Sequence, residues 1–392
     1  MVPISLRCKP LKYILNFDSM QRNYQEIESQ EALRRLLCGD GVITRCAFQS
    51  IDFSIEEAAV ERIYSDCIFM GCVIPEQMIN RLDNRCYIFP SIRKPFNCFP
   101  AQLYDSASLY AGYQPECEAS FGDCYDTRVY RHYVGKGKIS SDISEMLARA
   151  LHDHSVSDSL HEMLARYDER RVVAVMGGHA LLRTEDNYVK IAQISKQLTE
   201  MGYLMVSGGG PGAMEATHLG AWMAGREDDE LLEAVGMLRI APHYKDEGWL
   251  RSAFAVMEQF PCREDFCSIG MPTWFYGHEP ATPFASHIAK YFDNSVREDG
   301  LLAIAKGGVI YTPGSAGTMQ EIFQDAAQNH YETFGFASPM VFFGEEYWTR
   351  QVPVYELLKN LQQQGRYQNL LLSITDDIDS VVDYIISFGS AA

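Results

Sequence analysis

The sequence predicts an α/β protein in which a parallel sheet is wound with helices on both of its faces. From Arg171 onward, short apolar runs alternate with longer helical patterns, which is typical of parallel α/β sheets. Three glycine-rich turns follow predicted strands at their carboxyl ends, where α/β sheets gather ligands. The chain has 392 residues, of which 47% are hydrophobic, so we expect two or three domains with buried cores.

The first strand-turn-helix unit begins at residue 172. An apolar run over 172–176 predicts a strand, which ends in Gly177 and Gly178. Apolar residues then recur at spacings of three, four and three, which predicts an amphipathic helix: Ile191, Ile194, Leu198 and Met201.

The remaining elements continue this alternation to the end of the chain. Further strands are predicted over 203–206, 235–240, 309–312, 340–343 and 370–374. Further helices are predicted over 213–224, from about 284 to 306, from the loop after 312 to about 329, from about 347, and from 376 to about 387. The α/β part is therefore predicted to contain six strands.

The first third of the chain has no clear period, and we expect it to be a separate domain of mixed structure. We place the boundary at residue 168, with an N-terminal accessory domain of open role over 1–168 and the α/β domain over 169–392. Helices are predicted over 142–150 and 157–167, and Ser159 and Glu162 have capping-box spacing. No internal repeat is expected.

Composition argues against several classes of protein. The 34 Lys and Arg residues are outnumbered by 52 Asp and Glu, which gives a formal charge of −18 and makes nucleic acid an unlikely partner. No apolar run is long enough to span a bilayer, and the first 17 residues lack a signal-peptide pattern, so we expect a cytoplasmic protein without membrane contact. Nine of the 11 cysteines lie in the first third without a Cys-x-x-Cys pair, so we expect reduced thiols and no metal site.

The strongest chemical signal is the segment from Pro313 to Glu321, between a predicted strand and a predicted helix. Small residues at such a place leave backbone N–H groups free to bind a phosphate. The candidate phosphate ligands are Gly314, Ser315, Ala316, Gly317 and Thr318. The alternative is a tight turn in which Thr318 and Glu321 form a capping box. Because the other glycine turns point to the same sheet edge, we favour the phosphate site.

A second glycine segment runs from Ser207 to Ala216. It contributes Gly208, Gly209 and Gly210 to the candidate site, together with Gly177 and Gly178 from the first turn. The spacing Gly208-x-Gly210-x-x-Ala213 loosely fits a dinucleotide fingerprint. A dehydrogenase also needs an acidic residue after the next strand, and the predicted strand over 235–240 ends in Ala241-Pro242 instead, so hydride transfer is disfavoured.

A third group of polar residues lies between residues 276 and 297. Arg297 is the candidate ligand for a base or a phosphate, and a surface ion pair with Glu298 or Asp299 is the alternative. Lys290 is expected on a solvated helix face, and the histidines of this segment are expected to be ordinary packed or exposed side chains. The aromatic run over 274–276 is interpreted equally well as a base-stacking surface or as core.

Taken in order, these motifs resemble the LOG (Lonely Guy) family. The matching residues are Gly177-Gly178, Gly208 to Glu215, Arg297 and Pro313 to Glu321, within about residues 171–345. The usual family loop reads Pro-Gly-Gly-x-Gly-Thr-x-x-Glu, whereas this chain has Ser315 at the second paired glycine. Glu298 follows Arg297 where the family commonly has Lys.

The resemblance implies a Rossmann-like doubly wound sheet and the activity of a phosphoribohydrolase, a nucleosidase that splits nucleoside 5′-monophosphates into free base and ribose 5-phosphate. It implies a homodimer or a higher homo-oligomer and no cofactor. Members are often labelled lysine decarboxylases, but pyridoxal phosphate chemistry needs a Schiff-base lysine, typically preceded by histidine, and the sequence has no His-Lys pair.

The mechanism predicted from these residues uses Glu321 and Arg297. Cleavage of an N-glycosidic bond develops positive charge on the ribose, so a carboxylate near it stabilises that charge and orients water. We expect Glu321 in the first turn of the helix to do this, and Arg297 to offset charge on the departing base. The alternative function is a nucleotide-sensing module that binds without chemistry and uses residues 1–165 to signal.

Overall fold

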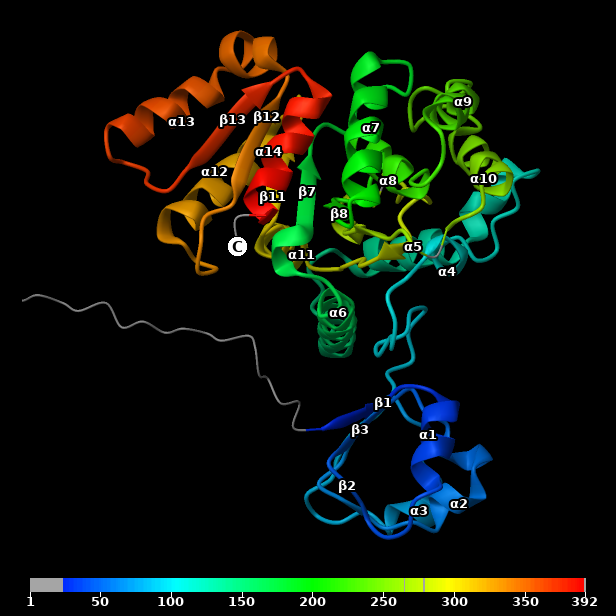
Figure 1. Cartoon of the computed structure of the whole chain (residues 1–392). Helices are drawn as coiled ribbons and strands as arrows, with labels where there is room; N and C mark the ends of the chain where they lie inside the picture. The colour runs from blue at the N-terminus through cyan, green and yellow to red at the C-terminus, as the bar shows by residue number, and fades with distance from the viewer. Residues whose placement is uncertain (1–23, 264, 278, 391–392) are drawn as a thin grey trace, which may run out of the picture.

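The larger part of the chain is built on a parallel sheet of seven strands (Figure 1). The computed structural model describes residues 24–263, 265–277 and 279–390. The strands are β7 (Val172–Met176), β8 (Leu204–Ser207), β9 (Ser268–Gly270), β10 (His287–Ile288), β11 (Gly308–Tyr311), β12 (Pro339–Phe343) and β13 (Leu371–Thr375). Their spatial order is β10-β9-β8-β7-β11-β12-β13, and all neighbouring pairs are parallel. This confirms the predicted α/β class.

Helices cover both faces of this sheet because successive strand residues point to opposite sides. The helices are α7 (Asp186–Glu200), α8 (Ala213–Trp222), α9 (Asp228–Leu238), α10 (Trp249–Gln259), α11 (Asn294–Ile304), α12 (Ala316–Tyr331), α13 (Val354–Gln363) and α14 (Ile378–Ser390). Val173 and Val175 of β7 pack in one hydrophobic cluster with α7, α8, α9 and α14, whereas Ala174 and Met176 pack in another with α11, α12 and α13.

The strand order reverses between β7 and β11 at the centre of the sheet. Strands β8, β9 and β10 follow on one side of β7, and β12 and β13 follow on the other side of β11. Loops that leave adjacent strands toward opposite sides open a crevice at such a point. The turns after β7 and β11 therefore lie where a ligand site is expected.

Three sequence predictions in this part are wrong. The strand predicted over 235–240 is the end of helix α9 and the turn after it. Helix α9 buries Leu231, Ala234, Val235 and Leu238 at helical spacing, and Glu227 with Glu230 forms its capping box. The long helix predicted from about 284 splits into β10 and α11. Strands β9 and β10 were not predicted because they are only three and two residues long.

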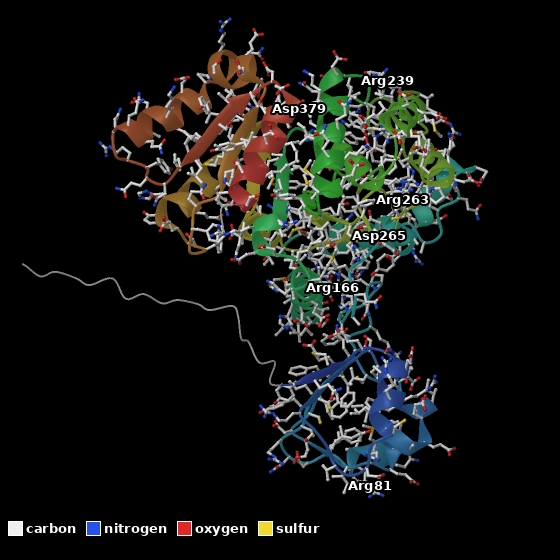
Figure 2. All side chains as sticks on the ribbon, viewed as in Figure 1. Arg81, Arg166, Arg239, Arg263, Asp265 and Asp379 are labelled. Carbon is white, nitrogen blue, oxygen red and sulfur yellow. The ribbon has the colours of Figure 1, made fainter. Side chains whose placement is uncertain are left out.

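The N-terminal part contains a second, smaller stack of parallel strands. Strands β1 (Gln25–Ile27), β3 (Cys46–Gln49), β5 (Ile68–Met70) and β6 (Tyr87–Phe89) pair in this order, and β2 (Ile43–Thr44) pairs with β4 (Tyr64–Ser65). Short helices lie between them: α1 (Gln30–Leu37), α2 (Glu57–Val60) and α3 (Glu76–Ile79). In Figure 2, Arg81 marks the end of this stack that lies farthest from the large sheet.

The small stack is an internal repeat, which contradicts the expectation that the chain has none. The paired residues are 21, 21 and 19 positions apart: Gln25 with Cys46, Ala47 with Ile68, and Ile68 with Tyr87. Aromatic residues at equivalent positions of neighbouring strands stack on each other: the ring centroids of Phe48 on β3 and Phe69 on β5 are 5.0 Å apart. The recurrence of cysteine at 46, 67 and 86 is the sequence signal that marks this repeat.

The hydrophobic core divides earlier in the chain than the predicted boundary at 168. One cluster runs from Ile27 to Met78 within the small stack. Residues from Phe96 to Met163 share a cluster with the large sheet, and they include α4 (Ser106–Leu109), α5 (Tyr125–Lys136) and α6 (Ile143–Leu164). Helix α6 is one helix where two were predicted, so Ser159 lies inside it and caps nothing. Among the described residues, no helix is long and apolar enough to cross a membrane.

Candidate functional site

The three predicted glycine turns meet at the carboxyl edge of the large sheet. Gly178 N–H donates to the Pro313 carbonyl at 3.1 Å, and Ala213 N–H donates to the Gly178 carbonyl at 3.2 Å. The turn after β7 therefore contacts both the loop after β11 and the loop after β8. The structure brings together the glycine turns that the sequence analysis proposed as one site.

Close backbone packing explains why glycine occupies these turns. A Cβ on Gly177 would lie 1.9 Å from Thr312 Oγ1, and a Cβ on Gly212 would lie 2.5 Å from the Gly178 carbonyl oxygen. Gly212 also has a φ of +71°, which side-chain-bearing residues rarely adopt. Any larger residue would push the turns apart.

The loop after β11 ends at the amino terminus of α12, whose first residue is Ala316. Residues 315–317 are exposed, and the N-cap residue Ser315 makes no side-chain capping bond. The first N–H groups of a helix have no partner within the helix, so these donors face the open edge of the sheet. Such an arrangement suits a phosphate group.

The capping-box alternative for this loop is wrong. Thr318 is the third residue of α12 rather than its N-cap, and its side chain is buried against Gly314, where a Cβ would lie 2.1 Å from Thr318 Oγ1. Glu321 consequently lies in the second turn of α12, not in the first turn as predicted. Tyr347 adds a support that the sequence did not indicate, because its hydroxyl donates to the Gly314 carbonyl at 2.5 Å.

Arg297 lies on α11 with only 9% of its surface exposed. Its Nη2 donates to Asn294 Oδ1 at 2.9 Å, and its buried Nε has no hydrogen-bond partner among the described residues. The alternative of a surface ion pair is wrong, since Glu298 accepts from Asn294 and Asp299 accepts from Gln324. A Cβ on Gly208 would lie 3.8 Å from Arg297 Nη1, which places the guanidinium beside the second glycine loop.

Two carboxyl groups on α12 have unusual acidity. Burial raises the pKa of Glu321 to about 7. The nearby Arg297 guanidinium opposes this rise, and the Glu298 carboxylate adds to it. Burial also raises the pKa of Asp325 to about 7, while the hydroxyl of Tyr311 donates to its Oδ2 at 2.6 Å and opposes this shift. Glu321 was predicted as a site residue, whereas Asp325 was not.

A buried ion pair holds the first turn of α8, which follows the second glycine loop. The guanidinium of Arg183 bonds both oxygens of Glu215, with Nε 2.9 Å from Oε2, and Tyr188 donates to Oε2 at 2.9 Å. Arg183 Nη1 also donates to the carbonyl of Leu238, the last residue of α9, and to the carbonyl of Trp249, the first residue of α10. This network fixes the start of α8 relative to the turn after β7.

A neutral histidine is hydrogen-bonded to the strand that leads into the second glycine loop. His218 bonds Ser207 Oγ at 2.8 Å and Ser268 Oγ at 2.9 Å, and Gly209 N–H donates to Ser207 Oγ at 3.1 Å. Complete burial lowers the pKa of His218 to about 3. The imidazole is therefore uncharged and serves as a fixed hydrogen-bonding link between β8, α8 and β9.

Two other residues singled out by the sequence, Lys290 and Trp274, belong to the core. Lys290 was expected on a solvated face, but it is 1% exposed and lies 2.7 Å from Asp126 Oδ1. Trp274 is fully buried, stacks on Phe292 and donates to the same Asp126 oxygen, so it is core rather than a base-stacking surface. His287 lies on β10, at the edge of the sheet.

Two further residues lie on the rim of the site: Glu279, which belongs to the third group of polar residues but has no predicted role, and His179, which the sequence analysis did not select. His179 follows Gly178 directly, and its Nδ1 is 3.4 Å from Glu279 Oε1. A Cβ on Gly210 would lie 3.8 Å from Glu279 Oε2. Only the folded structure brings them together, because they are 100 residues apart in the chain.

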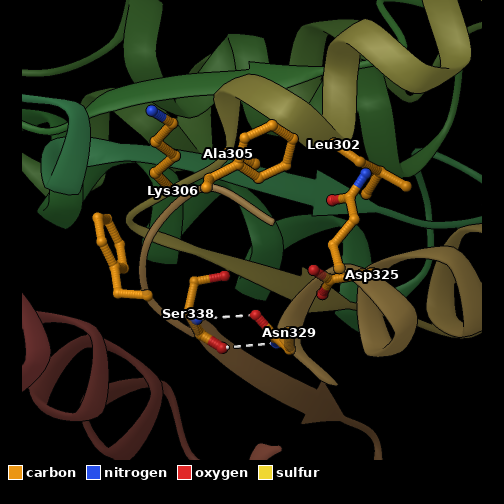
Figure 3. A pocket seen from close by; sticks show the side chains of 9 residues that line it. Leu302, Ala305, Lys306, Asp325, Asn329 and Ser338 are labelled. Carbon is orange, nitrogen blue, oxygen red and sulfur yellow. Dashed lines mark hydrogen bonds between the residues drawn. The ribbon is translucent and has the colours of Figure 1, made fainter. Parts of the chain in front are cut away.

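A small cavity lies behind the site, on the α12 side of the sheet (Figure 3). Its volume is about 10 Å³, and Asp325, Asn329, Ser338 and Lys306 contribute to its lining. The Asn329 amide bonds the backbone of Ser338 at 2.9 and 3.0 Å, which closes one wall. The cavity is too small for a nucleotide and has room for about one water molecule.

The glycine pattern in the second loop does not occupy the position that a dinucleotide fingerprint requires. The fingerprint follows the central strand next to the reversal of strand order, which is β7 here, whereas Gly208-x-Gly210 follows β8. This topology disfavours hydride transfer. The missing acidic residue at Ala241-Pro242 does not bear on it, because these residues follow helix α9 and not a strand.

No protein-family model matches the sequence, and no curated protein is significantly similar to it. Among solved structures, the Moco carrier protein of Chlamydomonas rheinhardtii is similar over 56% of this chain and 97% of its own length, with 14% identity and a TM-score of 0.34. The molybdenum cofactor binding protein of the phototrophic bacterium Rippkaea orientalis is similar over 55% of this chain and 95% of its own length, with 14% identity and a TM-score of 0.35. At TM-scores this low, neither similarity supports a statement about what this chain binds.

Proposed function

We propose that the protein is a phosphoribohydrolase of the LOG type, which cleaves nucleoside 5′-monophosphates into free base and ribose 5-phosphate. In this proposal the Rossmann-like doubly wound domain that contains residues 169–392 is the catalytic domain, and the small N-terminal stack of strands is an accessory domain. The observation that carries the proposal is the meeting of three groups at one sheet edge. These are the uncapped start of α12, the buried Arg297 with an unpartnered Nε, and Glu321 with a raised pKa.

The start of α12 is the proposed phosphate site. Backbone N–H groups of residues 314–318 would bind the 5′-phosphate, with the positive end of the helix dipole adding to their attraction. The carbonyl of Gly314 is held by Tyr347, so the loop keeps its shape without a ligand. Donors fixed in advance bind an anion at a lower entropic cost than a loop that must be ordered.

Glu321 is the proposed catalytic carboxylate. It lies one turn of the helix beyond the phosphate site, so rigid backbone sets its distance from the ribose. Its ionised form would stabilise positive charge on the ribose ring and orient water for attack on C1′. With a pKa of about 7, the carboxyl of Glu321 exchanges its proton near neutral pH, where general acid-base groups work best.

Arg297 is the proposed partner of the leaving group or the phosphate. A buried guanidinium that has one hydrogen bond and no ion pair among the described residues is unfavourable unless a ligand completes its coordination. Binding an anionic substrate, or a base that gains negative charge as it leaves, would supply that partner. The positive charge of Arg297 also lowers the pKa of Glu321 and so favours the ionised form of its carboxyl group.

The proposal is tested by incubating the full chain with adenosine, guanosine, cytidine and uridine 5′-monophosphates and with the unphosphorylated nucleosides. Free base should appear from monophosphates and not from nucleosides. Glu321→Gln should lower turnover by roughly 10²- to 10⁴-fold, the range for loss of an acid-base group. Glu258→Gln, an exposed carboxylate on α10, is the matched control and should keep its activity.

Two results would overturn the assignment. Unchanged turnover in Glu321→Gln would remove this residue from the mechanism. Binding of a monophosphate without release of base would favour the alternative function, a nucleotide-sensing module.

A further inference from the structure

The second glycine loop lies between two charged side chains: the guanidinium of Arg297 is near Gly208, and the carboxylate of Glu279 is near Gly210. A Cβ on Gly208 would lie 3.8 Å from Arg297 Nη1, and a Cβ on Gly210 would lie 3.8 Å from Glu279 Oε2. The side chain of Glu279 is 19% exposed, so it is largely desolvated but still reachable from the rim of the site. The mechanism described above uses Arg297 and gives Glu279 no role.

His179 connects this carboxylate to the proposed phosphate site. Its Nδ1 lies 3.4 Å from Glu279 Oε1, and the residue before it, Gly178, donates its N–H to the Pro313 carbonyl. The imidazole and the Tyr244 ring form a T-shaped pair, with ring centroids 6.0 Å apart and planes at 86°. Direct contacts thus run from the phosphate loop through Gly178 and His179 to Glu279.

We propose that Glu279 binds the ribose hydroxyls of the nucleotide and selects ribonucleotides over 2′-deoxynucleotides, with His179 as a positioning residue. An ionised carboxylate only accepts hydrogen bonds and has two oxygens, which match the two donors of the 2′,3′-diol. Acidic side chains read ribose hydroxyls in the same way in nucleotide sites of other α/β proteins. This inference rests on the proposed function, because it concerns the sugar of the same substrate.

The competing explanation is that Glu279 and His179 form an ion pair that only joins two loops. The two explanations differ in what they predict for the sugar. A structural pair would affect ribonucleotides and deoxynucleotides equally, whereas a ribose-binding carboxylate would affect only the substrate that carries the 2′-hydroxyl.

The experiment compares the four ribonucleoside 5′-monophosphates with their 2′-deoxy counterparts on the full chain. Dissociation constants are measured by calorimetry, and base release is measured by chromatography. The wild type should favour the ribonucleotide by roughly 10- to 100-fold, the range for a hydrogen bond to a charged group. In Glu279→Ala this ratio should fall close to one, and in the matched control Glu258→Ala it should stay as in the wild type.

The outcomes separate failure of this inference from failure of the proposed function. Equal treatment of both sugars by the wild type, with base released, would overturn the role of Glu279 and leave the phosphoribohydrolase standing. A preference that persists in Glu279→Ala would also overturn it. If no monophosphate of either series binds, the proposed function fails and this inference fails with it.

The role of His179 has its own readout. His179→Asn keeps a nitrogen donor near the position of Nδ1 and should retain most of the ribose preference, whereas His179→Ala should reduce it. A merely structural histidine would change the thermal midpoint in both variants and leave the sugar ratio unchanged.

Discussion

Asp325 provides a test of the electrostatics behind the candidate site. It is 3% exposed on α12, it accepts a hydrogen bond from Tyr311, and burial raises its pKa from 3.8 to about 7. In the unfolded chain the group ionises near 3.8. The folded state therefore holds a proton that the unfolded state has lost between pH 4 and 7, and stability falls as the pH rises through that window.

The magnitude follows from the pKa difference. Each pKa unit corresponds to about 1.4 kcal/mol, so a rise of roughly three units implies a penalty of about 4 kcal/mol above pH 7. At pH 5 only about one and a half kcal/mol of that penalty has appeared. Asp325→Asn carries no charge and has a similar shape, so it should gain roughly 2 to 3 kcal/mol on the wild type between pH 5 and pH 8.

Urea unfolding at pH 5, 6, 7 and 8 measures this difference. Glu321 titrates in both proteins and cancels from the comparison. Asp379→Asn, on the exposed side of α14 and labelled in Figure 2, is the control and should follow the wild type at every pH. A constant difference between Asp325→Asn and the wild type across this range would refute the reasoning, because it would mean that Asp325 does not titrate near neutrality.

Four further predictions address the site and the fold. The value of kcat/KM for base release should rise with pH through about 7 in the wild type, because the ionised form of Glu321 is the proposed active form; a profile that falls over this range would assign the carboxyl the opposite role. Arg297→Met should weaken binding of monophosphates by roughly tenfold or more, measured by calorimetry, since a charge-assisted hydrogen bond is lost. Gly314→Ala should weaken the same binding, because its Cβ would collide with Thr318 Oγ1, and an unchanged dissociation constant would show that the loop can relax. Gly236→Ala should raise the free energy of unfolding by about 0.5 to 1 kcal/mol in a urea titration, since the position is inside α9 and open space surrounds it.

The sequence predicted the parts of the fold that depend on local pattern. The apolar runs at β7, β8, β11, β12 and β13 are long enough to read as strands, and the helices after them carry clear apolar faces. Strands β9 and β10 are too short to show a period in the sequence. In β9 only the middle residue is apolar, because Ser268 and Gly270 flank it. The segment over 235–240 is rich in apolar residues and precedes a turn, so its sequence resembles a short strand, although it is the C-terminal end of α9 and the turn after it.

The candidate site divides in the same way. Gly178, Gly314 and Thr318 could be proposed from the sequence, because small residues after a strand have a direct steric meaning. The pairing of His179 with Glu279 depends on two loops 100 residues apart, and the acidity of Asp325 depends on burial against Tyr311. Neither the pairing of the two side chains nor the raised pKa can be predicted from a local sequence pattern.

The most direct test of the central claim is the product balance with a nucleoside 5′-monophosphate. The nucleotide is incubated with the full chain, and free base, ribose 5-phosphate and remaining nucleotide are quantified together. The proposal predicts equal amounts of free base and ribose 5-phosphate, matching the nucleotide consumed and lost in Glu321→Gln. Bound nucleotide recovered intact, or phosphate released in place of base, would contradict it.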